Sequence, residues 1–350
     1  MHSQNNNGLL TQANQWLKNH LPFVIYRYPN ETTLRGVFQE NDNLNSVCDL
    51  DHKGFVFMPF DPNKYGVLIK GNYKEEKYAP SKFKIKHVDL DFLNGNRQHH
   101  ISLVNKTIRE IKGGNLKKVV LSRSIHAKTN KPNSELMESL LTKYQNAFCY
   151  WWYHPKIGMW FGATPEQLLQ YQNKSILTSS LAGTLPYIQN KEPNWTSKER
   201  EEQQMVTDFI KDCLSEEVDN VLISTAKSFQ AGSLWHLKSV IKGELKSTSS
   251  LSKMVRVLHP TPAVCGLPRE QAFNFILENE DYDRKYYTGY LGPVNLEKDE
   301  SANLFVNLRC FKYSSSEAQI FVGGGITASS DAKKEWEETQ FKSRTILDVL

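Results

Sequence analysis

The sequence predicts an α+β protein in which large antiparallel sheets are layered together and wrapped by helices. Short strand candidates outnumber helices, and many of them pair as hairpins around tight turns. Regular alternation of strand, helix and strand is missing, which disfavours a doubly wound parallel sheet. Hydrophobic residues make up 39% of the 350 residues and charged residues 23%, as in ordinary globular proteins. Because large β-rich folds can form one unit, we expect a single domain over residues 1–350.

The first part of the chain is expected to be a short helix followed by strands. Within residues 1–20, Leu9, Leu10, Trp16 and Leu17 indicate an amphipathic helix after a polar start. Strands are expected at residues 22–28, 33–40, 54–60, 65–71 and 117–127. A helix from about residue 96 to 112 is expected to end at Gly113 and Gly114, since glycine favours helix C-termini.

The rest of the chain alternates hairpins with helices. Helices are expected at residues 134–143, 197–218 and 250–258, and a last one follows the capping residues Ser329, Ser330 and Asp331. Hairpins are expected at residues 147–166 and 167–186, and a loop at residues 259–268. Residues 283–296, 302–314 and 318–327 are expected to form three consecutive antiparallel strands.

Composition excludes several classes of protein. The net charge of +5 is small, and the most basic stretch, residues 77–87, alternates lysines with apolar residues like the wet face of a strand. No nucleic-acid partner is therefore expected. No uncharged apolar window approaches about 18 residues, and the start of the chain does not resemble a secretory signal, so no membrane contact is expected. Five scattered cysteines without a CxxC motif indicate reduced thiols in a cytoplasm. A monomer is the default expectation.

Two helices carry carboxylates on the face that continues into apolar residues. Glu335, Glu338 and Lys342 share a stripe with Ile346 and Val349. Glu202 lies one turn before Met205 and Val206 on the earlier helix. A buried carboxylate is costly unless it is paired or binds a cation, and Mg²⁺ prefers oxygen ligands. The alternative is a solvated face on which Glu338 and Lys342 form an i,i+4 pair.

A glycine-rich stretch, "FVGGGITASSD", precedes the last helix. Gly323, Gly325 and Ala328 formally match G-x-G-x-x-A, but no following strand with an acidic residue completes a dinucleotide site. Two readings remain: backbone N–H groups that hold an anion such as a carboxylate, or a tight turn.

Four other residues could carry chemistry. Strand alternation puts Lys117 and Lys118 on opposite faces without choosing between them; one could be a desolvated general base, or both could guard a sheet edge. Glu166 could be an acid with a raised pKa or a glutamate at a helix N-terminus. Arg309 sits among apolar residues and is expected to pair with a carboxylate of the protein or of a ligand.

Taken in order, ten stretches of the chain resemble the chorismate-utilising enzymes, most closely the isochorismate synthases. The stretches are "KVVLSR", "FGATPEQLL", "SLAGTLP", "KEREEQQMV", "HLKSVIKGEL", "LHPTPAVCGLP", "YYTGYLGPV", "NLRCF", "VGGGI" and "EWEETQFKS". They cover about residues 110–350, whereas residues 1–100 show much less resemblance to the family. The resemblance implies the layered α+β fold of this family, which aminodeoxychorismate synthases share.

The resemblance also implies a site for chorismate and Mg²⁺. The metal would be bound through Glu202 and Glu338, with Glu335 nearby, and would hold the ring carboxylate. The enolpyruvyl carboxylate would be held by Arg309, by the backbone at Gly323 and by Tyr287. Other residues implied to contact the substrate are Ala182, Gly183, His236 and Lys342.

The reaction that the resemblance implies is the addition of water. By this resemblance, family members that add ammonia have glutamine at the position of Lys118, whereas members that add water have lysine. Aminodeoxychorismate synthases have a lysine at the position of Ala182, so their chemistry is not expected here. Lys118 would be the general base that activates water at C2 of chorismate, and Glu166 the general acid that protonates the departing C4 hydroxyl. The product would be isochorismate, and no glutaminase subunit is expected.

Three alternatives to isochorismate synthase stay open. A salicylate synthase would use the same lysine and then eliminate pyruvate. An anthranilate synthase component I would depend on ammonia or a glutaminase. A non-catalytic anion or nucleic-acid binder would show salt-dependent binding and no turnover. Residue patterns do not decide whether the product enters a menaquinone, siderophore or salicylate route.

Overall fold

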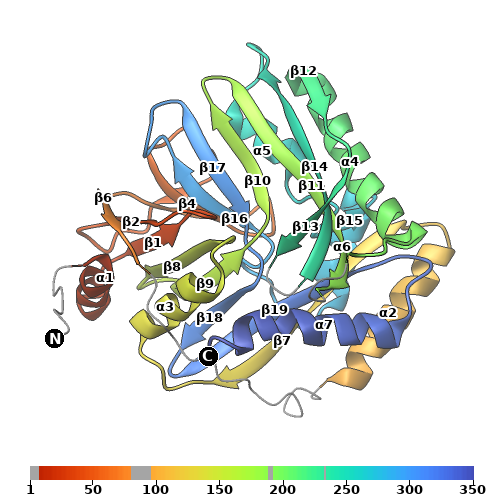
Figure 1. Ribbon diagram of the computed structural model, residues 1–350, viewed down its shortest axis with the longest axis horizontal. Coiled ribbons are helices and arrows are strands. Elements are labelled where there is room, and N and C mark those ends of the chain that lie inside the picture. Colours follow the sequence, from red (N-terminus) through yellow and green to blue (C-terminus); the bar gives the residue numbers. More distant parts are fainter. Residues whose placement is uncertain (1–7, 80–95, 188–191, 232–233) are drawn as a thin grey trace.

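The computed structural model describes residues 8–79, 96–187, 192–231 and 234–350. Two antiparallel sheets pack against each other, and helices cover their outer faces (Figure 1), which confirms the predicted fold class. Most of the basic stretch predicted at residues 77–87 lies outside the described residues. Within the described ranges, no helix has the length and apolar character needed to cross a membrane.

The first sheet has the strand order β15-β7-β19-β18-β9-β8-β1-β2-β6. Its strands are β1 (Phe23–Arg27), β2 (Thr33–Phe38), β6 (Asn72–Lys77), β7 (Lys118–Lys128), β8 (Phe148–His154), β9 (Gly158–Thr164), β15 (Gly266–Leu267), β18 (Cys310–Ser314) and β19 (Glu317–Ile326). The N-terminal strands β1, β2 and β6 thus extend the sheet that carries β7 and β19.

The second sheet has the order β12-β14-β11-β10-β17-β16-β4-β5-β3, with β13 paired to β14. Its strands are β3 (Ser46–Val47), β4 (Gly54–Met58), β5 (Gly66–Ile69), β10 (Gln167–Gln172), β11 (Ser175–Pro186), β12 (Val218–Ile223), β13 (Lys227–Ala231), β14 (Leu234–Leu245), β16 (Tyr290–Val294) and β17 (Ser301–Val306).

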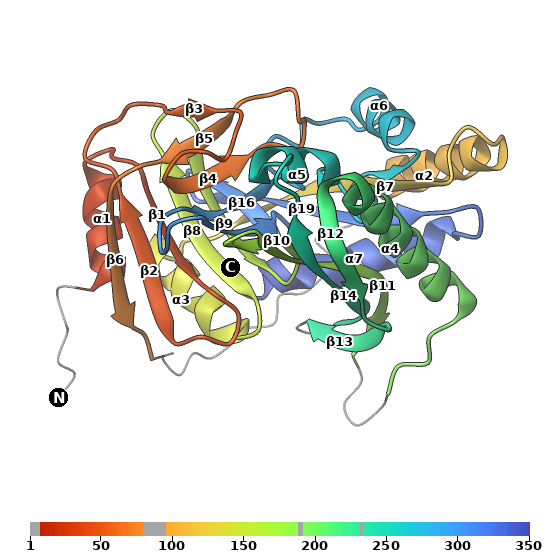
Figure 2. The same ribbon diagram turned by 90° about the horizontal axis from the view of Figure 1, so that it is seen from above.

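Helices lie on the outer faces of both sheets. They are α1 (Leu9–Lys18), α2 (Arg97–Lys112), α3 (Asn133–Lys143), α4 (Ser197–Glu217), α5 (Leu251–Leu258), α6 (Arg269–Asn279) and α7 (Ala332–Leu347). α4 and α5 cover the second sheet, and α1 and α3 cover the first near its N-terminal strands (Figure 2). The N-terminal strands and α2 lie at opposite ends of the molecule (Figure 2).

The core between the sheets is largely aromatic. Phe57 on β4 stacks on Tyr286 with ring centroids 4.3 Å apart, and it also contacts Trp152 of the other sheet at 4.9 Å. Phe148 stacks on Phe305 across the same interface at 4.2 Å. Such pairs bury large rings from both sheets, so both sheets contribute to one apolar layer.

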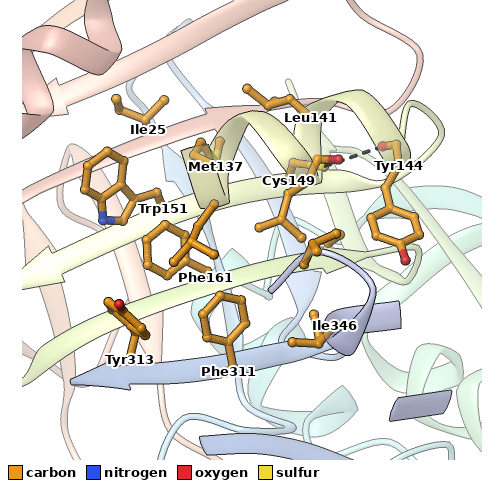
Figure 3. Packing of buried hydrophobic residues seen from close by; sticks show 14 of the residues in the cluster. Ile25, Met137, Leu141, Tyr144, Cys149, Trp151, Phe161, Phe311, Tyr313 and Ile346 are labelled. Carbon is orange, nitrogen blue, oxygen red and sulfur yellow. Dashed lines mark hydrogen bonds between the residues drawn. The ribbon is translucent and has the colours of Figure 1, made fainter. Parts of the chain in front are cut away.

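A second core lies on the outer face of the first sheet. Met137 and Leu141 of α3 pack over Trp151 and Phe161, and Ile346 near the end of α7 joins them (Figure 3). The predicted apolar end of the last helix is therefore buried here, since Ile346 and Val349 are each 1% exposed.

Two predictions about the last third of the chain are wrong. The strand expected at residues 302–314 is two strands in different sheets, because the chain crosses from β17 to β18 at residues 307–309. Arg309 adopts a left-handed backbone with φ of 48°, which ends strand pairing there. The strand expected at 283–296 is confined to β16. The sequence reading also missed α6, although Pro268 before it and the buried Ala272 and Ile276 are typical helix signals.

Candidate active site

A pocket opens where the chain crosses between the two sheets. It encloses about 850 Å³ of space not filled by atoms, part of it open to solvent. Glu166 lies on the crossing from β9 to β10, and Arg309 lies on the crossing from β17 to β18. A backbone hydrogen bond of 2.9 Å from Val306 N to Glu166 O ties the two crossings together. The chain thus brings a carboxyl group and a guanidinium into one pocket from two points where sheet pairing stops.

The pocket is lined by ten of the residues singled out from the sequence: Glu166, Ala182, Gly183, Glu202, His236, Tyr287, Arg309, Gly323, Glu338 and Lys342. The other two, Lys118 and Glu335, stand directly behind the lining. A Cβ added at Gly325, which lines the pocket, would come 2.9 Å from Lys118 Cε. One added at Gly324 would come 3.3 Å from Glu335 Oε2. The structure thus gathers all twelve residues around one site.

The glycine-rich part of β19 forms one wall of the pocket. Pairing between β18 and β19 ends at Phe311 and Ile320, while pairing with β7 continues to Ile326. One edge of Gly323–Gly325 is therefore turned to the pocket, and Lys342 Nζ donates a 2.9 Å hydrogen bond to Gly323 O. Of the two readings of this stretch, a tight turn is excluded because these glycines lie inside a strand.

The structure distinguishes Lys118 from Lys117. Lys118 is completely buried, whereas Lys117 is exposed. Lys118 Nζ donates a 2.8 Å hydrogen bond to Glu202 Oε1. Burial also raises the cost of ionising Glu202, but the ion pair with Lys118 outweighs it and holds the pKa of Glu202 below its usual value.

Each of the three predicted metal-ligating glutamates contacts a lysine. Glu202 pairs with Lys118, Glu335 Oε1 accepts from Lys198 Nζ at 3.0 Å, and Glu338 pairs with Lys342 at 2.7 Å. Among the described residues, no three His, Cys, Asp or Glu side chains are grouped closely enough to hold a metal ion together. The lysines therefore neutralise the carboxylates separately in this structure.

The carboxylates nevertheless have the character of Mg²⁺ ligands. Glu335 is 2% exposed, and its Oε2 is buried without a hydrogen-bond donor among the described residues. Burial and the neighbouring Glu338 raise the pKa of Glu335, although the contact with Lys198 opposes the shift. A carboxylate oxygen without a donor, with Glu338 nearby, is a ligand of the kind that Mg²⁺ prefers.

Glu166 has the properties of a general acid. Burial raises its pKa to about 7, although the nearby cations Lys118, Arg309 and Lys342 oppose the shift. The turn that carries it is fixed by a 3.2 Å hydrogen bond from its own N–H to Thr164 Oγ1. A carboxyl with this pKa is partly protonated at neutral pH, and its acid form can give a proton to a substrate.

His236 is a neutral hydrogen-bonding bridge. Its Nδ1 lies 2.9 Å from Gly183 O, and its Nε2 lies 2.9 Å from Arg309 Nη2. Because a carbonyl only accepts and a guanidinium only donates, the proton must be on Nδ1. Burial and the charge of Arg309 lower the pKa of His236 to about 3, which agrees with a neutral ring. His236 thereby orients Arg309 without cancelling its charge.

Tyr287 lies beside the glycine wall. A Cβ added at Gly323 would come 3.1 Å from Tyr287 Oη, so the hydroxyl sits against the backbone of β19. Burial raises the pKa of Tyr287, which keeps its hydroxyl protonated and able to donate. Arg309, Tyr287 and the edge of β19 together can bind an anionic group.

Sequence reasoning missed two groups at the site. Lys198 contacts Glu335, and its i,i+4 spacing from Glu202 was a signal that it shares that helix face. Thr288 lines the pocket with a left-handed backbone, φ of 61°, for which the sequence offers no signal.

Comparison with known proteins adds the family. The sequence profile described as "Chorismate binding enzyme" matches residues 69–350, most of the chain. The chain belongs to the chorismate-binding enzymes. The twelve residues gathered at the pocket all fall within the matched range.

Individual members of the family give the degree of similarity. The vibriobactin-specific isochorismate synthase of Vibrio cholerae is 30% identical over 244 residues, which cover 66% of this chain and 61% of that protein. Isochorismate synthase DhbC of Bacillus subtilis is 28% identical over 316 residues, which cover 84% of this chain and 77% of that protein. The structure of DhbC from Bacillus anthracis matches with a TM-score of 0.80 at 22% identity and covers 96% of this chain and 99% of that one.

Proposed function

We propose that this chorismate-binding enzyme is an isochorismate synthase that isomerises chorismate to isochorismate with Mg²⁺. The observation that carries this proposal is the buried Lys118 amine together with the buried Glu166 carboxyl, whose pKa is raised to about 7, at one pocket. Addition of water at one ring carbon and loss of hydroxide at another need one group of each kind. The similarity to isochorismate synthases supports the same reaction.

The substrate would be held at its two carboxylates. Arg309, Tyr287 and the backbone edge at Gly323 would bind the enolpyruvyl carboxylate through charge and hydrogen bonds. Mg²⁺ held by Glu202 and Glu338, with Glu335, would neutralise the ring carboxylate. Ala182 and Gly183 would line the ring, with His236 keeping Arg309 in place.

The proton transfers would be made by two residues. Lys118 would take a proton from water as its oxygen bonds to C2, and the ring double bonds would shift as the C4 hydroxyl leaves. Glu166 would protonate that hydroxyl, so that one water enters and one leaves. In this structure Lys118 Nζ donates to Glu202 Oε1, and Lys118 would be released from that contact when Glu202 holds Mg²⁺.

The product of the reaction tests this function. Purified protein is incubated with chorismate and Mg²⁺, and products are identified by mass and by a coupled pyruvate assay. Isochorismate with no pyruvate is expected. Pyruvate release would indicate a salicylate synthase, anthranilate formed with ammonia would indicate an anthranilate synthase, and no conversion would overturn the proposal.

We further propose the setting in which the enzyme acts. It would be a cytoplasmic monomer without a glutaminase subunit, since water needs no ammonia supply. Its product would enter menaquinone or siderophore synthesis, since similar proteins include the vibriobactin-specific enzyme of Vibrio cholerae and MenF of Escherichia coli, whose structure is described as menaquinone-specific.

A further inference from the structure

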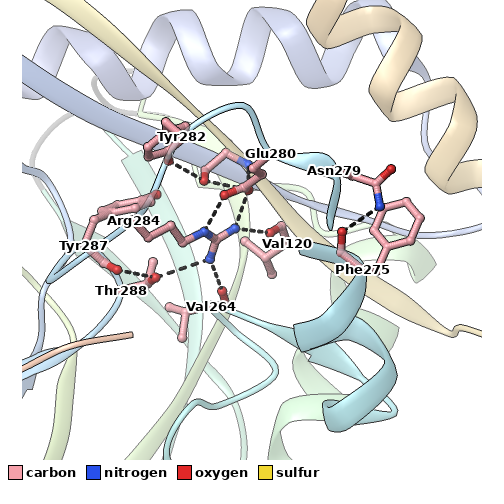
Figure 4. Close-up of polar contacts among 10 residues, drawn as sticks. Val120, Val264, Phe275, Asn279, Glu280, Tyr282, Arg284, Tyr287 and Thr288 are labelled. Atoms are coloured by element: carbon pink, nitrogen blue, oxygen red, sulfur yellow. Dashed lines mark hydrogen bonds and ion pairs between the residues drawn. The ribbon is translucent and has the colours of Figure 1, made fainter. Parts of the chain in front are cut away.

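A buried ion pair lies beside the pocket, outside the proposed catalytic groups. Glu280 and Arg284 have side chains that are each 2% exposed. Arg284 Nη2 lies 2.5 Å from Glu280 Oε1, and Arg284 Nε lies 2.7 Å from Glu280 Oε2 (Figure 4). The pair is bidentate, the strongest and most directional form of such contacts.

The two side chains of this pair make the hydrogen bonds to the backbone of β7 that a neighbouring strand would otherwise make. The short strand β15 pairs with Lys118 and Val119, and Val120 N donates to Cys265 O. Beyond that point Arg284 Nη2 donates to Val120 O at 2.7 Å, and Glu280 Oε1 accepts from Ser122 N at 2.7 Å. Backbone groups that would otherwise be buried without partners are thus satisfied by two side chains.

The same guanidinium reaches the loop that carries Tyr287. Arg284 Nη1 donates to Val264 O at 3.0 Å and to Thr288 Oγ1 at 3.2 Å (Figure 4). Thr288 Oγ1 in turn donates to Tyr287 O at 2.6 Å. A β-branched residue at positive φ is strained, and these two contacts hold Thr288 in its conformation together with a 2.9 Å hydrogen bond from its N–H to Asn307 O.

Both ends of this network meet at Gly323. Ser122, bound by Glu280, is the register partner of Gly323 on β19. Tyr287, held through Thr288 and Arg284, places its hydroxyl against that same Gly323. The ion pair therefore links the two surfaces that form the anion-binding end of the pocket.

We propose that Glu280 and Arg284 are positioning residues, which fix Tyr287 against Gly323 and so set the affinity of the pocket for the enolpyruvyl carboxylate. This inference rests on the proposed function. It does not concern the proton transfers, because neither side chain lines the pocket.

Two variants of the network, one control, and Tyr287→Phe alone and combined with Glu280→Gln test the role. Glu280→Gln keeps an acceptor for Ser122 but loses the charge that holds Arg284. Thr288→Gly keeps the positive φ, which glycine adopts freely, but loses the hydroxyl link. Tyr282→Phe is the control, since its hydroxyl contacts Ser122 Oγ at 2.6 Å in the same cluster without touching Tyr287.

The measurement is the steady-state dependence on chorismate and on Mg²⁺. Loss of one oriented hydrogen bond to an anion is worth about tenfold. Glu280→Gln and Thr288→Gly are expected to raise KM for chorismate about tenfold, with kcat within about threefold and Mg²⁺ dependence unchanged. Tyr287→Phe should raise KM similarly, and Glu280→Gln combined with Tyr287→Phe should be no worse than the worse single variant.

Additive effects of Glu280→Gln and Tyr287→Phe would contradict the positioning role. An unchanged KM in Thr288→Gly would also contradict it, and this variant supplies the test if Glu280→Gln does not fold.

If the unaltered protein does not convert chorismate, the proposed function fails by itself. Hydrogen exchange then tests the ion pair alone: Glu280→Gln, and not Tyr282→Phe, should speed amide exchange in β7 around Ser122, and equal rates would overturn the strand-replacement role.

Discussion

Glu166 is buried and surrounded by cations, and these two effects act on its pKa in opposite directions. Burial disfavours the carboxylate, whereas Lys118, Arg309 and Lys342 favour it, and burial prevails. Its pKa of about 7 lies above the ordinary value, so the acid form is present below that pH and is lost as the pH rises through it.

The first prediction is an alkaline loss of activity. The value of kcat/KM for chorismate should fall as the pH rises through about 7, because Glu166 can no longer donate a proton. Glu166→Gln should lower kcat by about 10² to 10⁴-fold and remove this limb from the residual rate. A variant that retains the limb would assign it to another group.

The second prediction compares two adjacent lysines. Lys118→Gln should lower kcat by about 10² to 10⁴-fold, because the amide can still donate to Glu202 but cannot accept a proton from water. Lys117→Gln is the matched control and should stay within about threefold, since Lys117 is exposed on the opposite face. Thermal melting followed by circular dichroism shows whether both variants fold. Equal rates for the two variants would refute the assignment of the base.

At the scale of elements, the strand β19 can lie close to the charged side chains of the pocket because it has only glycines there. Gly325 lies against Glu202 and Lys118, and Gly324 lies against Glu335 and Glu338. α7 contributes its charged first half to this contact and its apolar end to the core on the first sheet. One helix can do both because its polar and apolar residues share a stripe but occupy different turns.

The third prediction tests that lack of side chains. A methyl group at Gly325 would come 2.6 Å from Glu202 Oε1, well inside contact distance, whereas one at Gly324 would come no closer than 3.3 Å to any atom. Gly325→Ala should therefore lower kcat/KM by about tenfold or more and cost about 1–3 kcal/mol of stability. Gly324→Ala should change both less. Steady-state kinetics and denaturant unfolding measure the difference, and the reverse order would show that the Lys118–Glu202 pair tolerates displacement.

At the scale of the molecule, the site depends on both sheets at once. Lys118 and the glycine wall come from the first sheet, and His236 and Ala182 come from the second. The aromatic layer between the sheets keeps their separation constant, because close-packed rings leave little room to shift. Strands from the N-terminal hundred residues take part in both sheets.

The fourth prediction concerns this shared core. We expect the chain to unfold in one transition, with circular dichroism and tryptophan fluorescence coinciding, since both sheets share the layer around Phe57. Phe57→Ala should lower the free energy of unfolding by about 3–5 kcal/mol and keep the single transition. Two separated transitions would contradict one cooperative unit.

Local patterns in the sequence determined the class of fold, most strands and helices, and the residue types of the site. Alternation, β-branched runs and glycine or aspartate at helix ends act over a few residues, so they are readable without a structure. The break at Arg309 was not readable, because the contacts of this left-handed residue come from distant strands: Ala163 N donates to its carbonyl at 3.1 Å, and its side chain contacts His236 at 2.9 Å.

Only the tertiary structure decided which side chains meet and which are buried. Lys118 begins a run of residues buried on both faces of β7, so alternation could not say which lysine is inside. Its partner Glu202 is 84 positions away, and Lys198 meets Glu335 across 137 positions. Such pairs depend on how whole sheets and helices pack, and that packing follows from the sum of many long-range contacts rather than from any short stretch of sequence.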